Sequence, residues 1–253
     1  MSVVITTIIT TAPYSHMNES FHLQHAVQSL SRVPMLLENP VFICFDGGEI
    51  DPSVPLNPRC AHPTDLAEYE RYKDRNKSWI LEHVPHAQFF ELPFRGCLTR
   101  NIHQCFHKIE TEYIHIMQHD LPIEKEIPLL CILEVMNQHP EIKLVRYAAR
   151  AENRFHEEFT RDAMGIESLP QEEVELEGTR FSRCNQWSDQ NHITTRRYYQ
   201  DLVFPETLPQ YGFMENHLLF KPITNHTRYG TYYLGGYEDG GYCRHSDARN
   251  TIK

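Results

Sequence analysis

The chain has 253 residues, of which 40% are hydrophobic and 23% are charged, the balance of a globular protein that buries a core. Its formal net charge of −10 argues against a nucleic-acid-binding protein, which needs a broad basic face. No apolar run approaches the ~20 residues of a membrane span, and the N-terminus lacks the pattern of a secretory signal. We therefore expect a soluble, cytoplasmic protein.

Strands and helices are predicted to alternate along the first 147 residues. Runs rich in β-branched and aromatic residues predict five strands, at residues 3–10, 41–45, 87–92, 113–117 and 143–147. Helical spacing and capping residues predict four helices, at residues 19–31, 65–83, 99–109 and 128–139. Asn18 is expected to cap the first helix, and Asp65 with Glu68 to begin the second as a capping box. Such alternation is typical of an α/β fold with a mostly parallel sheet flanked by helices.

The second part of the chain is less regular. Residues 151–179 are acidic, with five glutamates between positions 167 and 177, and are expected to form a solvated segment. Order is expected to return over residues 181–199. The tail, residues 229–242, holds five of the eleven glycines and is predicted to be a mobile loop. We expect a single domain, with a nucleotide-binding half at 1–147 and a site-completing, acceptor-binding half at 148–253.

The seven cysteines are odd in number and form no Cys-x-x-Cys pair. Most of them lie inside apolar patterns. They are therefore predicted to be reduced core residues, and neither a disulfide framework nor a zinc site is expected.

The most informative segment is the predicted fourth strand, which ends at an acid. Asp120 follows this apolar run, and Pro122 prevents the strand from extending further. In open α/β sheets, ligands bind outside the carboxyl ends of the strands. A carboxylate at that edge is a good ligand for Mg²⁺ or Mn²⁺, so the segment predicts a phosphate-handling enzyme.

Several of these features together resemble a known family. The chain begins with a strand, has Asp46 after its second strand, Arg100-Asn101 in a helix, and Asp120 after its fourth strand. This arrangement is similar to nucleotide-sugar glycosyltransferases with the GT-A fold, in particular the inverting enzymes of glycan assembly, including those of large algal viruses. The family's Asp-x-Asp signature corresponds here to Gln118-His119-Asp120, in which the metal-binding last Asp is present and the first is an amide.

A second match to this family lies at residues 211–216. The segment Tyr-Gly-Phe-Met-Glu-Asn is similar to the aromatic-Gly-aromatic-x-Glu-Asp motif of inverting galactosyltransferases, with Asn216 in place of the family's acceptor-activating Asp. These enzymes carry a metal-binding His about thirty residues further on. His245 stands thirty residues after Glu215 in this chain.

The resemblance implies a role for each candidate residue. Asp120 and His245 would hold Mn²⁺ or Mg²⁺, and either Glu215 or Asp189 would accept the proton of the attacking hydroxyl as the sugar is inverted. Trp187 would stack on a sugar ring. The donor is expected to be a uridine diphosphate sugar. The remaining candidates would bind it, and they are Thr10, Thr11, Ala12, Pro13, Asp46, Arg100, Gln118 and His119. The reaction implied is transfer of a hexose or pentose to a glycan.

Two other functions remain open at this stage. A sugar-phosphate nucleotidyltransferase would use a related sheet, but such enzymes carry a Gly-rich basic loop after strand one, and residues 11–16 contain no Gly, Lys or Arg. A catalytically inactive sugar-binding module would fit the altered residues Gln118 and Asn216. The chain is also compatible with one module of a longer multi-domain enzyme.

Overall fold

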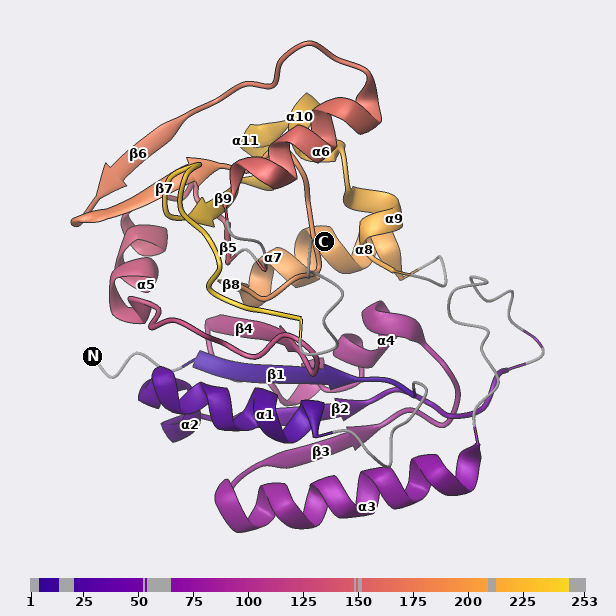
Figure 1. The fold of residues 1–253 in the computed structure, drawn as a ribbon. Coiled ribbons are helices and arrows are strands. Elements are labelled where there is room, and N and C mark those ends of the chain that lie inside the picture. The colour runs from indigo at the N-terminus through magenta and orange to yellow at the C-terminus, as the bar shows by residue number, and fades with distance from the viewer. Residues whose placement is uncertain are drawn as a thin grey trace, which may run out of the picture.

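The computed structural model describes residues 5–13, 21–51, 53, 65–147, 149, 152–208 and 213–245. In this part of the chain a single mixed sheet is flanked by helices on both faces (Figure 1). Both the α/β class and the flanked sheet agree with the prediction. The predicted cap Asn18 and most of the Pro-rich segment 51–63 lie outside the described residues.

The first four strands are all parallel. They are β1 Ile5–Thr11, β2 Val41–Phe45, β3 Gln88–Glu91 and β4 Tyr113–Gln118. Each lies where the sequence predicts a strand, and their carboxyl ends meet at one edge of the sheet.

The second half of the sheet is mixed. It contains β5 Leu144–Arg146, β6 Glu173–Leu176, β7 Thr179–Arg183, β8 His192–Thr195 and β9 Thr231–Leu234. The strand order is β3-β2-β1-β4-β8-β5-β9-β7-β6, and β8 runs antiparallel to both of its neighbours. The expectation of a mostly parallel sheet thus holds only for the first half, because the strand–helix alternation on which it rested stops at β5.

Four helices lie close to their predicted positions, and they are α1 His22–Ser29, α3 Leu66–His83, α4 Cys97–His103 and α5 Leu129–Gln138. The short helix α2, Pro34–Glu38, has no counterpart in the prediction. The Asp65 carboxylate accepts a hydrogen bond from the Glu68 backbone N–H at 3.0 Å, which confirms the predicted cap of α3. The later helices are shorter: α7 Arg196–Tyr198, α8 Phe204–Thr207, α9 Glu215–Leu218, α10 Lys221–Thr224 and α11 His226–Tyr229.

Alternating side chains of β1 build two cores, one on each face of the sheet. Ile5 and Ile9 belong to the cluster that includes buried residues of α1, α3 and α5. Ile8 points to the other face, where it joins the cluster that contains residues of α4 and of the segment 198–204. In Figure 1, α1, α2 and α3 lie below β1, and α4 lies above it.

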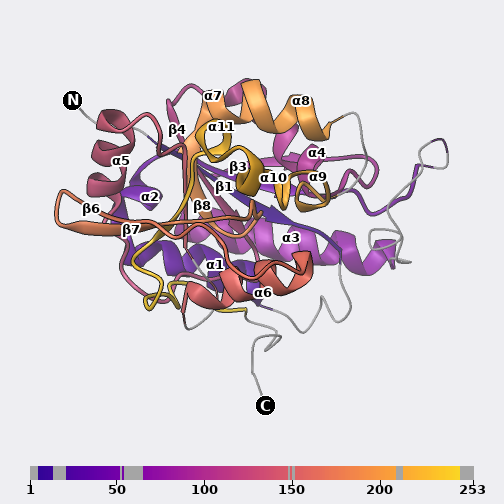
Figure 2. The ribbon, with the colours of Figure 1, turned by 90° about the horizontal axis from the view of Figure 1, so that it is seen from above.

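Two segments differ from the prediction. The acidic region contains helix α6, Arg154–Met164, and the hairpin β6–β7, which projects beside α5 in both views (Figures 1 and 2). The sequence does not predict helix α6, because its buried side chains are the polar His156, Glu157 and Thr160 and so give no apolar stripe at helical spacing.

The glycine-rich tail contains the fully buried strand β9, which pairs with β5 and β7. The prediction of a mobile loop is therefore wrong for residues 231–234. Gly230 and Gly235 adopt positive φ at either end of β9, so these glycines bound the strand and do not disrupt it.

Cys97 forms a disulfide whose partner lies outside the described residues, so the expectation of reduced cysteines is wrong at this position. The described free cysteines are Cys44, Cys105, Cys131, Cys184 and Cys243. Cysteine pairing depends on which loops meet in space, which spacing alone did not reveal. No described helix combines the length and apolar character that crossing a membrane demands.

A buried histidine in β4 predicts sensitivity to acid. His115 is fully buried, and within the described residues neither of its ring nitrogens has a hydrogen-bond partner. Burial, with a smaller contribution from nearby His192, lowers its pKa to about 3. Because the folded state binds this proton less readily than the unfolded state, stability is lost as the pH falls below about 6.5.

We predict that His115→Leu will make the free energy of unfolding less dependent on pH. Between pH 6.5 and 4, the wild type should lose ~3 kcal/mol more than the variant, since it must charge a buried imidazole. Urea denaturation at each pH measures the difference. His107→Leu, at an exposed position, should keep the wild-type dependence. Parallel curves for wild type and His115→Leu would contradict the prediction.

Candidate functional site

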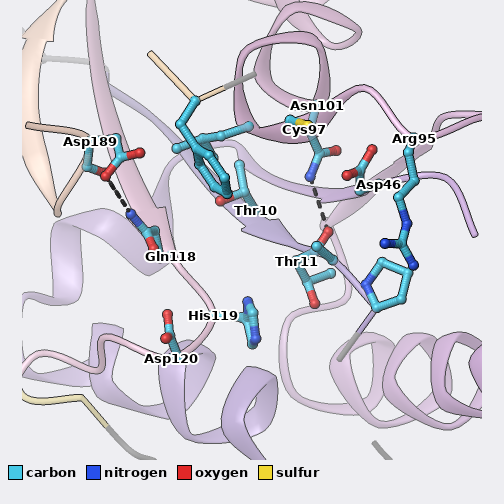
Figure 3. Close-up of a pocket in the computed structure, with 14 residues that line it drawn as sticks. Thr10, Thr11, Asp46, Arg95, Cys97, Asn101, Gln118, His119, Asp120 and Asp189 are labelled. Atoms are coloured by element: carbon cyan, nitrogen blue, oxygen red, sulfur yellow. Dashed lines mark hydrogen bonds between the residues drawn. The ribbon is translucent and has the colours of Figure 1, made fainter. Parts of the chain in front are cut away.

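A cavity of about 240 Å³ lies at the carboxyl ends of β1, β2 and β4 (Figure 3). We call it the first cavity. It brings together most of the residues predicted to bind the donor or metal, which are Thr10, Thr11, Ala12, Pro13, Asp46, Gln118, His119 and Asp120, and it also contains Asp189, one of the two predicted proton acceptors. Sequence reasoning missed the other described lining residues, which are Arg95, Cys97, Leu98, Asn101 and Phe213.

Asp46 and Arg95 lie at one end of the first cavity (Figure 3). The Asp46 Oδ1 atom accepts backbone hydrogen bonds from Gly47 at 2.9 Å and from Gly96 at 2.7 Å. A Cβ atom on Gly47 would come within 2.1 Å of the Phe94 carbonyl carbon, so this turn requires glycine. The Asp46 carboxyl is thereby fixed where β2 ends.

The arginine that lines the cavity differs from the predicted one. Among the described lining residues it is Arg95, whereas Arg100 acts electrostatically on Asp51 outside the lining. Neighbouring Asn101 has a structural position, since its amide donates to the Thr11 carbonyl at 3.0 Å and the Cys44 carbonyl at 3.1 Å. Arg95 follows β3 by only a few residues, and that place beyond a strand end is the signal that could have identified it.

Gln118 occupies the opposite end of the cavity beside Asp189 (Figure 3). Its side-chain amide donates to the Asp189 carbonyl at 2.9 Å and to the Asp189 Oδ1 atom at 3.2 Å. The amide that replaces the first acid of the Asp-x-Asp pattern therefore holds Asp189 in place.

A second cavity, of about 890 Å³, adjoins the first. Its described lining residues come from β5, α6, the segment 186–190, α9, α10 and the tail, and they are Arg146, His156, Phe159, Met164, Gln186, Ser188, Gln190, Glu215, Asn216, His217, Leu219, Phe220, Lys221, Thr224 and His245. The predicted residues Glu215 and His245 thus lie on this side.

Two carboxyl groups meet between the cavities. Asp189 lines the first cavity and Glu215 the second. The Glu215 Oε1 atom accepts from the Asp189 backbone N–H at 3.2 Å and from the Ser188 hydroxyl. Burial, together with the adjacent Glu215 charge, raises the pKa of Asp189 well above its ordinary value.

A second contact between the two cavities joins Asp120 and His245. The Asp120 Oδ2 atom lies 3.4 Å from the His245 Nδ1 atom, with Asp120 in the first lining and His245 in the second. Two ligands that each lie ~2.1 Å from one ion are roughly 3 Å apart when adjacent, so the pair fits a shared divalent cation. Among the described residues no group of three or more metal-binding side chains occurs.

Asn191 ties the loop before β8 to the end of β4. Its Oδ1 atom accepts from the Gln118 backbone N–H at 3.0 Å, and its amide donates to the Leu121 carbonyl at 2.7 Å. The same amide lies 3.2 Å from the Cys243 sulfur. Asn191 thus holds the backbone on both sides of Asp120 and reaches the segment that carries His245.

Trp187 does not occupy the predicted position. Its side chain is fully buried in the core cluster shared with α4 and α9, and its ring packs edge-on against His192. No face of the indole is accessible to a sugar, so the expected stacking role is corrected. Phe213 is the aromatic residue that lines the first cavity instead.

The environment of Asp46 leads to a second pH-dependent prediction. Burial raises its pKa to about 6, although the two glycine N–H groups and Arg95 oppose the shift. The folded state therefore favours the neutral carboxyl, and this contribution to stability is lost as the pH rises from about 3.8 to 6.

We predict that Asp46→Asn will remove this contribution, because the amide cannot ionise. The stability of the variant relative to wild type should rise by ~3 kcal/mol between pH 4 and pH 7. Urea denaturation at both pH values measures it. A difference that does not change with pH would contradict the prediction.

Comparison with known proteins finds solved structures with a similar fold. No protein-family model matches the chain, and no curated protein matches it in sequence. Among solved structures, S. aureus TarS 1–349 matches with a TM-score of 0.54 and 13% identity, over 96% of this chain and 60% of that one. Glucosyl-3-phosphoglycerate synthase from Mycobacterium tuberculosis, solved with Mn²⁺, uridine diphosphate and phosphoglyceric acid, matches with a TM-score of 0.50 and 12% identity, over 99% of this chain and 72% of that one. This chain therefore spans less than two thirds of the length of the TarS structure. The chain has the GT-A fold of nucleotide-sugar glycosyltransferases.

Proposed function

We propose that this protein is a metal-dependent, inverting glycosyltransferase that moves a sugar from a nucleoside diphosphate, with uridine diphosphate the preferred carrier, to an acceptor hydroxyl. The observation that carries the proposal is the pair of contacts between the two cavities, Asp120 with His245 and Asp189 with Glu215. A transferase needs its donor and acceptor on opposite sides of one reacting carbon, and these contacts lie between two such spaces.

The first cavity is the donor side in this proposal. The nucleoside binds between residues 10–13 and Asp46, and the diphosphate extends toward Asp120. Asp120 and His245 would hold the cation, and mixed oxygen and nitrogen ligation suits Mn²⁺ at least as well as Mg²⁺. When bound, the ion would stabilise the negative charge that develops on the leaving diphosphate. The structure of the Mycobacterium tuberculosis synthase contains Mn²⁺ and uridine diphosphate, which supports the choice of this cation and this nucleotide in the proposal.

Glu215 is the proton acceptor in this proposal. The acceptor oxygen attacks the anomeric carbon, the bond from that carbon to the diphosphate breaks, and the hydroxyl proton passes to Glu215. The raised pKa of Asp189 favours its neutral carboxyl form, which can donate a hydrogen bond to Glu215 and so position it. One displacement of this kind inverts the anomeric centre.

The proposed metal site predicts that uridine diphosphate binds more tightly when Mn²⁺ is present. Asp120→Asn and His245→Gln should each remove most of this enhancement, because each deletes one of two protein ligands, with losses of about 10- to 100-fold. Isothermal calorimetry with and without Mn²⁺ measures it, and His107→Gln on the surface serves as the control. If the wild type binds uridine diphosphate equally well with and without Mn²⁺, the proposed metal site is contradicted. Release of pyrophosphate from UTP and a sugar phosphate would instead identify a nucleotidyltransferase.

The two carboxyl groups should respond differently to amide substitution. Glu215→Gln should lower kcat by about 10²- to 10⁴-fold, the usual contribution of a general base. Asp189→Asn should cost less than about 10-fold, since its amide can still donate to Glu215. The rate of release of uridine diphosphate from a UDP-sugar, measured for both variants, decides between them. The reverse order would assign the proton acceptor to Asp189.

A further inference from the structure

Arg146 is a buried cation that the proposed chemistry does not use. It is the last residue of β5, its side chain is only 1% exposed, and it lines the second cavity. A buried charge is costly unless it is paired and its hydrogen-bond donors are satisfied. The contacts of this guanidinium therefore indicate what the cavity is built to bind.

Few of its donors have partners within the described residues. One Nη atom points to the Cys184 sulfur at 3.8 Å, a weak acceptor, and the Nε atom has no partner. The guanidinium carbon lies 5.0 Å from the centre of the Tyr233 ring, which supports the charge but accepts no N–H bond. A guanidinium carries five donors, so most of its hydrogen-bonding capacity is unused here.

The carboxylates of Glu157 and Glu215 offset part of the Arg146 charge but accept no hydrogen bond from its guanidinium among the described contacts. Among the described residues no carboxylate lies within 4.0 Å of the guanidinium, so Glu157 and Glu215 act on it only at longer range. The Glu157 oxygens already accept bonds from Asn185 and from the Tyr233 hydroxyl. An additional acceptor for Arg146 must come from whatever occupies the cavity.

The rest of the lining is compatible with a negatively charged occupant. Glu215 is the one carboxylate among the described lining residues, whereas the cavity also presents Lys221 and the imidazoles of His217 and His245. Lys221 is held by Glu206, so Arg146 is the stronger candidate for contact. Among the described lining residues the formal charges are the positive ones of Arg146 and Lys221 and the negative one of Glu215, whereas the whole chain has a net charge of −10.

We propose that the second cavity binds an acceptor that bears an oxyanion, either a phosphate or a carboxylate, and that Arg146 holds this group. The planar guanidinium fork can donate two parallel hydrogen bonds to the two oxygens of such a group. The acceptor hydroxyl then faces Glu215, which lines the same cavity. That second statement rests on the proposed transferase function, whereas the binding of the oxyanion does not.

Three matched probes test the proposal: glucose, glucuronate and glucose 6-phosphate. They share a pyranose ring and differ in charge, so their binding is compared by isothermal calorimetry at 0.15 M salt, an ionic strength of about physiological value. The charged probes should bind roughly 10- to 100-fold more tightly than glucose, and the tighter of the two identifies the class of oxyanion. Inorganic phosphate should compete with glucose 6-phosphate.

The preference should depend on Arg146. Arg146→Met keeps the length of the side chain and should abolish the preference, and Arg146→Lys, which keeps the charge but not the fork, should retain only part of it. Arg197→Met is the matched control, because Arg197 is an exposed arginine, with its side chain 88% exposed, and it should preserve the wild-type preference.

Equal binding of glucose and the charged probes by wild type would overturn the proposal, whether or not the variants fold. A preference that survives in folded Arg146→Met would overturn it as well. These measurements use neither donor nor metal. Their failure would leave the predictions for Asp120 and Glu215 standing, and a failure of those predictions would leave the oxyanion site standing.

Discussion

The site depends on the loop of residues 188–191, which enters the sheet between the two halves of the chain. Ser188 and Asp189 hold the Glu215 carboxylate, and Asn191 holds the backbone on both sides of Asp120. Because β8 follows directly and pairs with both β4 and β5, the loop has little freedom to move. One short segment thus fixes the separation between the proposed cation ligand and the proposed proton acceptor, which is the geometry a displacement reaction requires.

Each of the two cavities contains a buried arginine, although the chain as a whole is acidic. A chain with a net charge of −10 repels phosphates at long range, so recognition must come from groups at the point of contact. The first cavity offers Arg95 beside Asp46 together with the proposed cation at Asp120, and the second offers Arg146. Arg95 and Arg146 are both almost fully buried, so the field of each guanidinium is screened less by water and salt than at the surface.

The sequence predicts the strands and helices of the first half of the chain well because their signals are local. Apolar runs that end at Asp46 and Asp120 mark strand ends, and parallel strands bring those ends together. Burial in the second half could not be predicted in this way, since α6 buries polar side chains and Arg146 lies within a strand three residues long. The contact between Asp189 and Glu215, and the burial of Trp187, depend on how distant loops pack, which residue spacing does not encode.

The amide at position 118 has a consequence for how this site can vary. Gln118 donates to Asp189, so an acid at the same position would add a third carboxyl group beside the buried Asp189 and the half-buried Glu215. Like charges at this spacing raise one another's affinity for protons, and a third would compete for the few donors present. Gln118→Asp would therefore disturb the neighbouring pair. The amide and the two acids form a matched set, and a change in one of them requires a compensating change in another.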